Sequence, residues 1–175
     1  MDTHADTDTT TDTTTFTTLE SPLGELLLVG RAGMLTSLSM PGQRTAPAVR
    51  PGWRRDDDAF PEATAQLAAY FAGRLTRFDL RFAADGTDFQ RRVWQAVDAI
   101  PYGTTTTYGA LATHLGVARA DTPAVGAALG ANPLLIVRPC HRVIGADGSM
   151  RGYAGGVERK VRLLTHEGAL QPTLL

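Results

Sequence analysis

The sequence has a single cysteine, Cys140, a single lysine, Lys160, and no long hydrophobic run. One cysteine excludes an internal disulfide framework and any zinc site built from several cysteines of one chain. The longest apolar stretches, such as residues 26–29 and 134–137, are far shorter than the roughly 18 residues that a membrane-spanning helix needs. The first residues also lack the basic and apolar segments of a signal peptide. We therefore expect a soluble, cytoplasmic protein with no membrane partner.

The net charge of −1 over 175 residues hides two different halves. Residues 1–85 carry eight basic and twelve acidic side chains, whereas residues 86–175 carry nine basic and six acidic ones. A basic C-terminal half is compatible with a polyanionic partner, but ordinary surface arginines explain so small an excess equally well. The hydrophobic content of 43% supports a folded core and excludes global disorder.

The N-terminal half predicts a small α+β domain over residues 16–85, preceded by a disordered tail rich in Thr and Asp over residues 1–15. Apolar runs at 16–20, 25–29 and 34–40 are separated by turn signals, which favours an antiparallel meander. Pro61 suits the first turn of a helix that stops at Gly73. Alternation over residues 78–82 predicts a half-buried strand.

The C-terminal half, residues 86–175, predicts a mainly helical domain. Thr87 and Gln90 form a capping-box pattern, and Thr107 can cap a short helix over residues 108–115. A third helix over residues 124–131 is made of small residues, so the pair fits a helix-turn-helix. The run at 134–137 predicts a buried strand, and a last helix spans about 157–167. The overall fold class is therefore α+β.

Cys140 follows this buried run and stands beside His141, with Arg138 and Arg142 close by. Positive surroundings can lower the pKa of a thiol from about 8.5 to roughly 3.5–7.5 and so produce a thiolate. Glu167 on the last helix could orient the histidine, as the third group of an activated nucleophile does. From composition alone, an inert buried cysteine beside a surface histidine is the favoured alternative.

The order of the residues changes this balance. Asn132-Pro133, the run 139–144 (Pro-Cys-His-Arg-Val-Ile), the segment 152–156 (Gly-Tyr-Ala-Gly-Gly) and Glu167-Gly168 resemble the O6-alkylguanine-DNA alkyltransferases. Further motifs extend the resemblance over about 150 residues: Phe89-Gln90, Val93-Trp94, Pro101-Tyr102-Gly103, Tyr108-Gly109, Ser21-Pro22-Leu23-Gly24 and Tyr70-Phe71.

The resemblance implies direct-reversal DNA repair in a single turnover. An alkyl (methyl) group would pass irreversibly from O6 of a flipped guanine to Cys140, with O4 of thymine as a second candidate position. His141 would deprotonate the thiol through a water and Glu167 would hold the imidazole. Asn132 would brace the turn that carries the cysteine, and Tyr108 would donate a proton to the departing guanine.

The resemblance also implies a binding surface for double-stranded DNA that contains O6-alkylguanine. Tyr153 would line the base pocket, with main-chain groups at Cys140, Val143 and Ala154 binding the guanine. The helix-turn-helix would lie in the minor groove, where small residues permit close approach, although tight core packing explains part of the same pattern. The expected DNA-binding residues are Thr107, Tyr108, Arg119, Pro123, Ala124, Ala127, Gly130, Ala131 and Arg142.

Two departures from the family bear on these expectations. Pro123 stands where the family has an arginine that fills the gap left by the flipped base, so either Arg119 replaces it or flipping is weakened. Some relatives bind a zinc with Cys and His in the N-terminal domain, but here Cys140 is the only cysteine and His4, His114 and His166 are scattered, so we expect no metal.

The absence of a Gly-rich loop after a strand predicts no cofactor. We expect a monomer.

Two other classes of function remain open. A damage-binding protein that recognises alkylguanine without repairing it would have lost the acceptor cysteine, which is present here, but Pro123 keeps this class in play. A cysteine hydrolase or redox enzyme would need a second cysteine or a hydrolase signature, and the sequence has neither.

Overall fold

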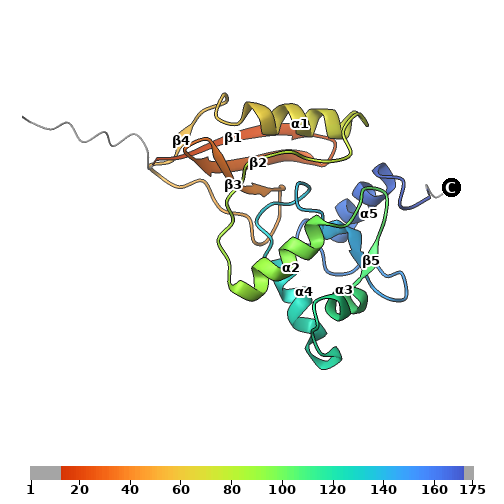
Figure 1. Cartoon of the computed structure of the whole chain (residues 1–175). Helices are drawn as coiled ribbons and strands as arrows, with labels where there is room; N and C mark the ends of the chain where they lie inside the picture. Colours follow the sequence, from red (N-terminus) through yellow and green to blue (C-terminus); the bar gives the residue numbers. More distant parts are fainter. Residues whose placement is uncertain (1–12, 172–175) are drawn as a thin grey trace, which may run out of the picture.

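The computed structural model describes residues 13–171. Figure 1 shows an N-terminal sheet with helix α1 above it and helices α2 to α5 below it in that view. One apolar core runs through both parts, because Leu38 of the sheet and Leu135 of the C-terminal part belong to the same cluster of buried side chains. The architecture is the expected α+β fold, and the two predicted parts share one core.

The sheet has the strand order β3-β2-β1-β4. Strands β1 (Thr14–Ser21), β2 (Gly24–Arg31) and β3 (Met34–Ser39) form the expected antiparallel meander, and the short β4 (Arg54–Arg55) pairs parallel to β1. The first strand begins at Thr14, slightly before the predicted end of the tail at residue 15. Residues 1–12 of that predicted tail lie outside the described residues.

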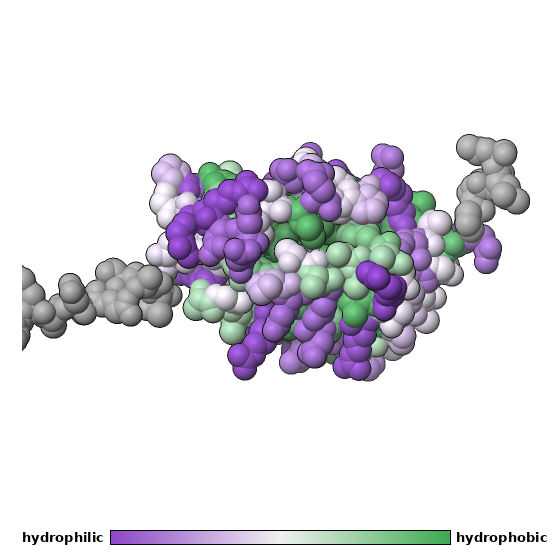
Figure 2. All heavy atoms as spheres, turned by 90° about the horizontal axis from the view of Figure 1, so that it is seen from above, coloured by the Kyte–Doolittle hydropathy of each residue, from purple (hydrophilic) through white to green (hydrophobic). Residues whose placement is uncertain are grey.

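Helix α1 (Pro61–Phe71) begins at the predicted proline, and the chain leaves it through Gly73, whose φ of +76° suits glycine. Its buried residues are Ala63, Leu67 and Tyr70, and Tyr70 is completely buried. Figure 2 shows the face seen from the α1 side, where hydrophobic residues gather near the centre and hydrophilic ones surround them.

Two predicted strands are wrong. Of residues 78–82, only Phe82 forms a bridge, to Leu35, and of residues 134–137 only Leu134 does, to Leu38. Both segments cross the free edge of β3 at single points, so neither runs along it as a strand. The second turns sharply because Ile136 adopts a φ of +70°, between Pro133 and Pro139, which have no N–H to donate to a sheet.

The remaining elements form the C-terminal part. They are α2 (Asp88–Asp98), β5 (Thr106–Thr107), α3 (Tyr108–His114), the 3₁₀ turn η2 (Arg119–Asp121), α4 (Thr122–Gly130), the 3₁₀ turn η3 (Cys140–Arg142), β6 (Val143–Ile144) and α5 (Val157–His166). The capping box at Thr87 and the Thr107 cap are both present, and β5 pairs parallel to β6. The pairing of β5 with β6 holds the start of α3 beside the segment that follows Cys140. No helix of the described part is long and apolar enough to cross a membrane.

Gly30 lies at a β-bulge between β2 and β3, and the fold leaves no room for a side chain there. A Cβ atom would come within 2.2 Å of the Met34 carbonyl oxygen and 2.6 Å of the Phe60 ring. We expect Gly30→Ala to lower the free energy of unfolding by about 1–3 kcal/mol through overpacking. Urea denaturation measures the change. Gly109→Ala, in open space on α3, should be neutral or stabilising by up to about 1 kcal/mol, and equal losses in the two variants would contradict the argument.

Candidate active site

The Cys140 thiol is buried, with 5% of the residue exposed, at the first position of η3. Asn132, which is 1% exposed, donates from Nδ2 to the sulfur over 3.0 Å and to the Leu134 and Arg138 carbonyls over 3.3 and 3.4 Å. Its Oδ1 accepts from the Leu134 N–H over 3.0 Å. One side chain therefore fixes both ends of the turn and touches the thiol, in the place where the sequence predicted a brace.

Burial raises the pKa of Cys140 to about 12, while Arg138 and the Asn132 hydrogen bond act in the opposite direction. The net direction is opposite to the lowered pKa that the basic neighbours predicted. The physical reason is that the sulfur lies inside the core, where the charged form loses its hydration, and that Arg142 turns away from it. A reaction through the thiolate therefore needs a group that removes the proton.

His141 is completely buried and its Nε2 lies 2.8 Å from Glu167 Oε2. Burial lowers the pKa of His141, against the effect of Glu167, so the ring is neutral near pH 7. An ionised carboxylate can only accept, so we assign the ring proton to Nε2. Nδ1 is then a free acceptor, and it has no hydrogen-bond partner among the described residues. This pair can orient a base whose unprotonated nitrogen is available.

Glu167 follows α5 as its C-cap and collects hydrogen bonds from three side chains. Arg142 donates from Nε over 2.7 Å, and the Tyr70 hydroxyl donates over 2.6 Å from α1. Burial alone would raise the pKa of Glu167, but the hydrogen bonds from His141 and Arg142 lower it to about 2. The carboxylate therefore stays ionised at neutral pH.

The expectation that Arg142 contacts DNA is wrong for this structure. The residue is 7% exposed, and its guanidinium binds Glu167 and the Ile100 carbonyl, the latter over 2.6 Å. It also lies 5.7 Å from the centre of the Tyr102 ring. Each of the three guanidinium nitrogens donates a hydrogen bond inside the protein, and the charge pairs with the buried ionised carboxylate. Arg142 serves Glu167 instead.

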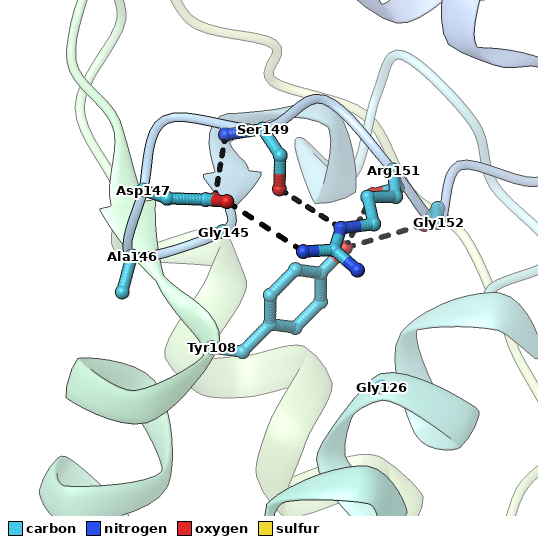
Figure 3. A pocket seen from close by; sticks show the side chains of 8 residues that line it. All are labelled: Tyr108, Gly126, Gly145, Ala146, Asp147, Ser149, Arg151 and Gly152. Atoms are coloured by element: carbon cyan, nitrogen blue, oxygen red, sulfur yellow. Dashed lines mark hydrogen bonds and ion pairs between the residues drawn. The ribbon is translucent and has the colours of Figure 1, made fainter.

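A pocket of about 540 Å³ opens between α3, α4 and the segment after β6 (Figure 3). Its lining residues are Tyr108, Gly126, Gly145, Ala146, Asp147, Ser149, Arg151 and Gly152. Tyr108 begins α3 and its hydroxyl donates over 2.9 Å to the Arg151 carbonyl. A side chain at position 152 would come within 2.9 Å of that hydroxyl, and Gly152 has a φ of +80°. Glycine there lets the loop pass close to Tyr108.

Of the predicted base-binding residues, Tyr153 directly follows Gly152 of this pocket and contacts His141. Tyr153 is buried, its ring packs edge-on to His141 at 6.3 Å, and its hydroxyl has no partner among the described residues. Ala154, which follows it, is half-buried and packs on the core. The Val143 carbonyl accepts from Lys160 Nζ over 2.5 Å, so one of its lone pairs is already engaged.

The predicted DNA-binding residues of α3 and α4 fall mainly on one accessible side. Apart from the buried Arg142, they are exposed or half-exposed: Thr107, Tyr108, Arg119, Pro123, Ala124, Ala127, Gly130 and Ala131. Val125, Ala128 and Leu129 of α4, which are outside the predicted set, are buried, so core packing explains those positions. Arg119 lies in η2, between α3 and α4. The small residues of α4 thus form two faces, and the accessible one has no bulky side chain.

Three residues of the site were given no role from the sequence. Lys160 is fully buried, donates to the Val143 and Arg151 carbonyls, and has a pKa lowered by burial to about 8. The one feature of the sequence that could have drawn attention to Lys160 is that it is the only lysine of the chain. Tyr70 lay in a recognised motif, but its contact with Glu167 joins residues 97 positions apart. Arg138 was noted only for its charge, whereas it pairs with Asp98 over 3.2 Å.

Comparisons with known proteins agree along nearly the whole described chain. Residues 15–84 match the family description "6-O-methylguanine DNA methyltransferase, ribonuclease-like domain", and residues 88–169 match the corresponding "DNA binding domain". A methylated-DNA–protein-cysteine methyltransferase of Mycolicibacterium paratuberculosis is 49% identical over 157 residues, covering 90% of this chain and 94% of the relative. One of Methanosarcina acetivorans is 45% identical and covers 86% and 96%.

Solved structures give the same result. A crystal structure of Mycobacterium tuberculosis OGT in complex with DNA is similar to this chain with a TM-score of 0.82 and 47% identity, covering 89% and 93% of the two chains. An O6-methylguanine-DNA methyltransferase from Pyrococcus kodakaraensis, at 21% identity and a TM-score of 0.52, shares the fold. Within residues 13–171 no group of three or more His, Cys, Asp or Glu side chains is placed to hold a metal ion.

The buried neutral His141 makes stability depend on pH. The unfolded chain binds a proton at His141 near its ordinary pKa of about 6.5, whereas the folded state resists it. The free energy of unfolding should therefore fall as the pH drops below about 6.5, and fall again between about 4.5 and 2, where unfolded Glu167 takes up a proton. Urea denaturation across this range measures both losses.

His141→Gln should flatten the first of these losses, because the titrating group is gone. His114→Gln, which changes an exposed residue of α3, should leave the profile as it is. A wild-type stability that stays constant or rises from pH 6.5 to 5 would contradict a neutral buried His141.

Tyr70→Phe removes one hydrogen bond to the ionised Glu167 without removing the ring. We expect a loss of about 1.5–3 kcal/mol in the free energy of unfolding, the range for hydrogen bonds to charged groups. Because that bond lowers the pKa of Glu167, acid unfolding should also move to higher pH. Tyr102→Phe is the control, since Tyr102 is half-exposed; similar losses in both variants would show that the hydroxyl contact does not matter.

Proposed function

The chain belongs to the methylated-DNA–protein-cysteine methyltransferase family, and we propose that it repairs alkylated DNA by moving the alkyl group onto Cys140 in a single, irreversible turnover. The observation that supports this assignment best is the arrangement around the thiol. One sulfur contacts Asn132, and beside it His141 is oriented by Glu167 with a free nitrogen. This is the machinery that an activated nucleophile needs.

The proposed chemistry begins with removal of the thiol proton. His141 Nδ1 would accept it through a bridging water, since adjacent residues rarely face each other directly, and Glu167 would stabilise the imidazolium that forms. The bond from sulfur to the alkyl carbon forms while the bond from that carbon to O6 of guanine breaks. The electron pair of the broken bond leaves with the guanine, which takes up a proton, so the net transfer exchanges the thiol hydrogen for the alkyl group.

Tyr108 is the proposed proton donor to the departing guanine. Burial raises the pKa of its hydroxyl, and nearby Cys140 adds to the effect. The hydroxyl therefore keeps its proton until a strong base, such as the anionic guanine, appears. In the protein alone it donates to the Arg151 carbonyl, so it would turn to the base when the pocket is filled.

The proposed base site lies along the segment 143–154. Tyr153 would pack against the flipped base, the Cys140 and Val143 carbonyls would accept from the guanine amine, and the Ala154 N–H would donate to O6. The adjoining pocket, which Tyr108 and Gly152 help to line, has a volume of about 540 Å³, within the size range of small-molecule sites. Flipping costs a few kcal/mol, less for a poorly paired damaged base.

The proposed DNA surface is the accessible side of α3 and α4, in the minor groove. Its exposed small residues would allow the backbone of the protein to approach the duplex closely. Thr107 caps α3 and would contact DNA with it. Pro123 cannot stack as a guanidinium does, so Arg119 on η2 is the proposed substitute. The proposal extends to O4-alkylthymine as a second substrate.

We also propose that the protein acts as a monomer in the cytoplasm. One chain supplies the thiol, the His141–Glu167 pair and the pocket, so the reaction needs no second copy. The proposed substrate is chromosomal DNA.

The mass of the intact protein tests the function. After incubation with duplex DNA containing O6-methylguanine, we expect one added CH₂ unit per protein, and no addition in Cys140→Ser. His141→Gln should slow the transfer by about 10²- to 10⁴-fold, the usual contribution of a general base.

Other outcomes would favour other classes of protein. Binding to the modified duplex without a change in mass would indicate a damage-binding protein. Repeated turnover without an adduct would indicate a hydrolase or redox enzyme and exclude single-use repair.

A further inference from the structure

The pocket described above carries one basic side chain among its lining residues, that of Arg151. Figure 3 shows the guanidinium extending across the pocket beside Tyr108, towards Asp147 and Ser149. Its side chain is 80% exposed. The opposite wall, at Gly126 of α4, offers no charge. Arg151 is therefore the lining side chain that can attract a negatively charged group, and its partner in this structure is Asp147 of the same pocket.

The backbone of Arg151 is fixed from inside the protein. Its carbonyl accepts from the Tyr108 hydroxyl over 2.9 Å and from Lys160 Nζ over 3.2 Å. Both donors are themselves anchored, Tyr108 at the start of α3 and Lys160 in the core. The guanidinium is therefore attached at a defined position beside the pocket, although its tip remains exposed to solvent.

The tip of the side chain is held only weakly. Nε donates to the Ser149 hydroxyl over 3.1 Å, and a terminal nitrogen lies 3.6 Å from the Asp147 carboxylate, which is 67% exposed. Exposed ion pairs of this kind contribute about 0–1 kcal/mol. A stronger anionic acceptor can replace Asp147 at little cost.

We propose that Arg151 leaves Asp147 and binds a backbone phosphate next to the flipped nucleotide, so that it favours alkylguanine in DNA over the free base. The planar guanidinium matches two phosphate oxygens at once. This inference rests on the proposed repair function. It assigns the phosphate contact to the segment that follows β6, and it is separate from the role proposed for Arg119, which is not among the residues that line the pocket.

The rate of alkyl transfer tests this assignment when it is measured with two substrates. One is a duplex oligonucleotide with a single O6-methylguanine; the other is the free base O6-benzylguanine, which has no phosphate. With the duplex, below saturation, we expect Arg151→Gln to lower the second-order rate constant about 3- to 30-fold at low salt. The slope of the logarithm of that constant against the logarithm of the salt concentration, measured between about 50 and 200 mM, should become shallower by about 1, the value for one phosphate contact.

Three further variants test whether the effect comes from a phosphate contact of the Arg151 guanidinium. Arg151→Lys should keep most of the duplex rate and of its salt dependence, because a lysine also binds phosphate. Arg50→Gln, a matched charge change in the exposed loop before β4, should behave as wild type. Repeating Arg151→Gln in an Asp147→Asn background should give the same fold loss, which excludes the freed Asp147 carboxylate as its cause.

With the free base, Arg151→Gln should react as fast as wild type or faster. An equal slowing with both substrates would show that Arg151 acts by holding the loop, and an unchanged duplex rate would show that it does not touch DNA; either result overturns the inference. Failure of the repair function itself would look different, because the wild-type protein would then gain no mass from either substrate.

Discussion

A single buried carboxylate holds the functional parts of this protein together. Glu167 accepts hydrogen bonds from Tyr70 on α1, and from His141 and Arg142 on η3, while it stands at the end of α5. Removing a carboxylate from water is costly, and the cost is offset only because several donors converge on it. Through Tyr70, the N-terminal sheet-and-helix layer is thus connected to Glu167, which in turn orients His141 beside the thiol. This layer does more than support the fold, since its helix supplies one of the donors that keep the carboxylate ionised and in place.

The site combines a rigid interior with one weakly held side chain, that of Arg151. Asn132 fixes the turn, Lys160 and Tyr108 fix the loop after β6, and each of these contacts is made by a buried or half-buried group. The thiol is held protonated by burial, so the protein in the absence of DNA keeps its reactive group both inaccessible and neutral. A protein that uses its acceptor cysteine only once gains from this protection, because any chance alkylation or oxidation of the thiol would inactivate it.

Much of this arrangement can be predicted from the sequence, and the failures have physical causes. Caps at Thr87 and Thr107 are local signals, so α2 and α3 begin where predicted. The strands predicted at 78–82 and 134–137 fail because apolar patterns report burial, and burial does not reveal whether a partner strand lies alongside. The DNA contact of Arg142 was expected only from the family resemblance, and only the fold shows that its guanidinium binds the buried Glu167 carboxylate. Tyr70 received no role because its partner, Glu167, lies 97 positions away, and nothing local in the sequence marks a hydrogen bond between α1 and the end of α5.

Lys160 has a consequence for the surface of the molecule. It is the only lysine, and it is buried with its amine in hydrogen bonds, so every exposed side-chain cation of the described fold, histidine aside, is a guanidinium. Guanidinium groups keep their charge at all physiological pH values. Lysine acetylation therefore cannot remove charge from this surface. Reagents that couple to lysine amines would therefore leave the exposed cations of the described fold unmodified.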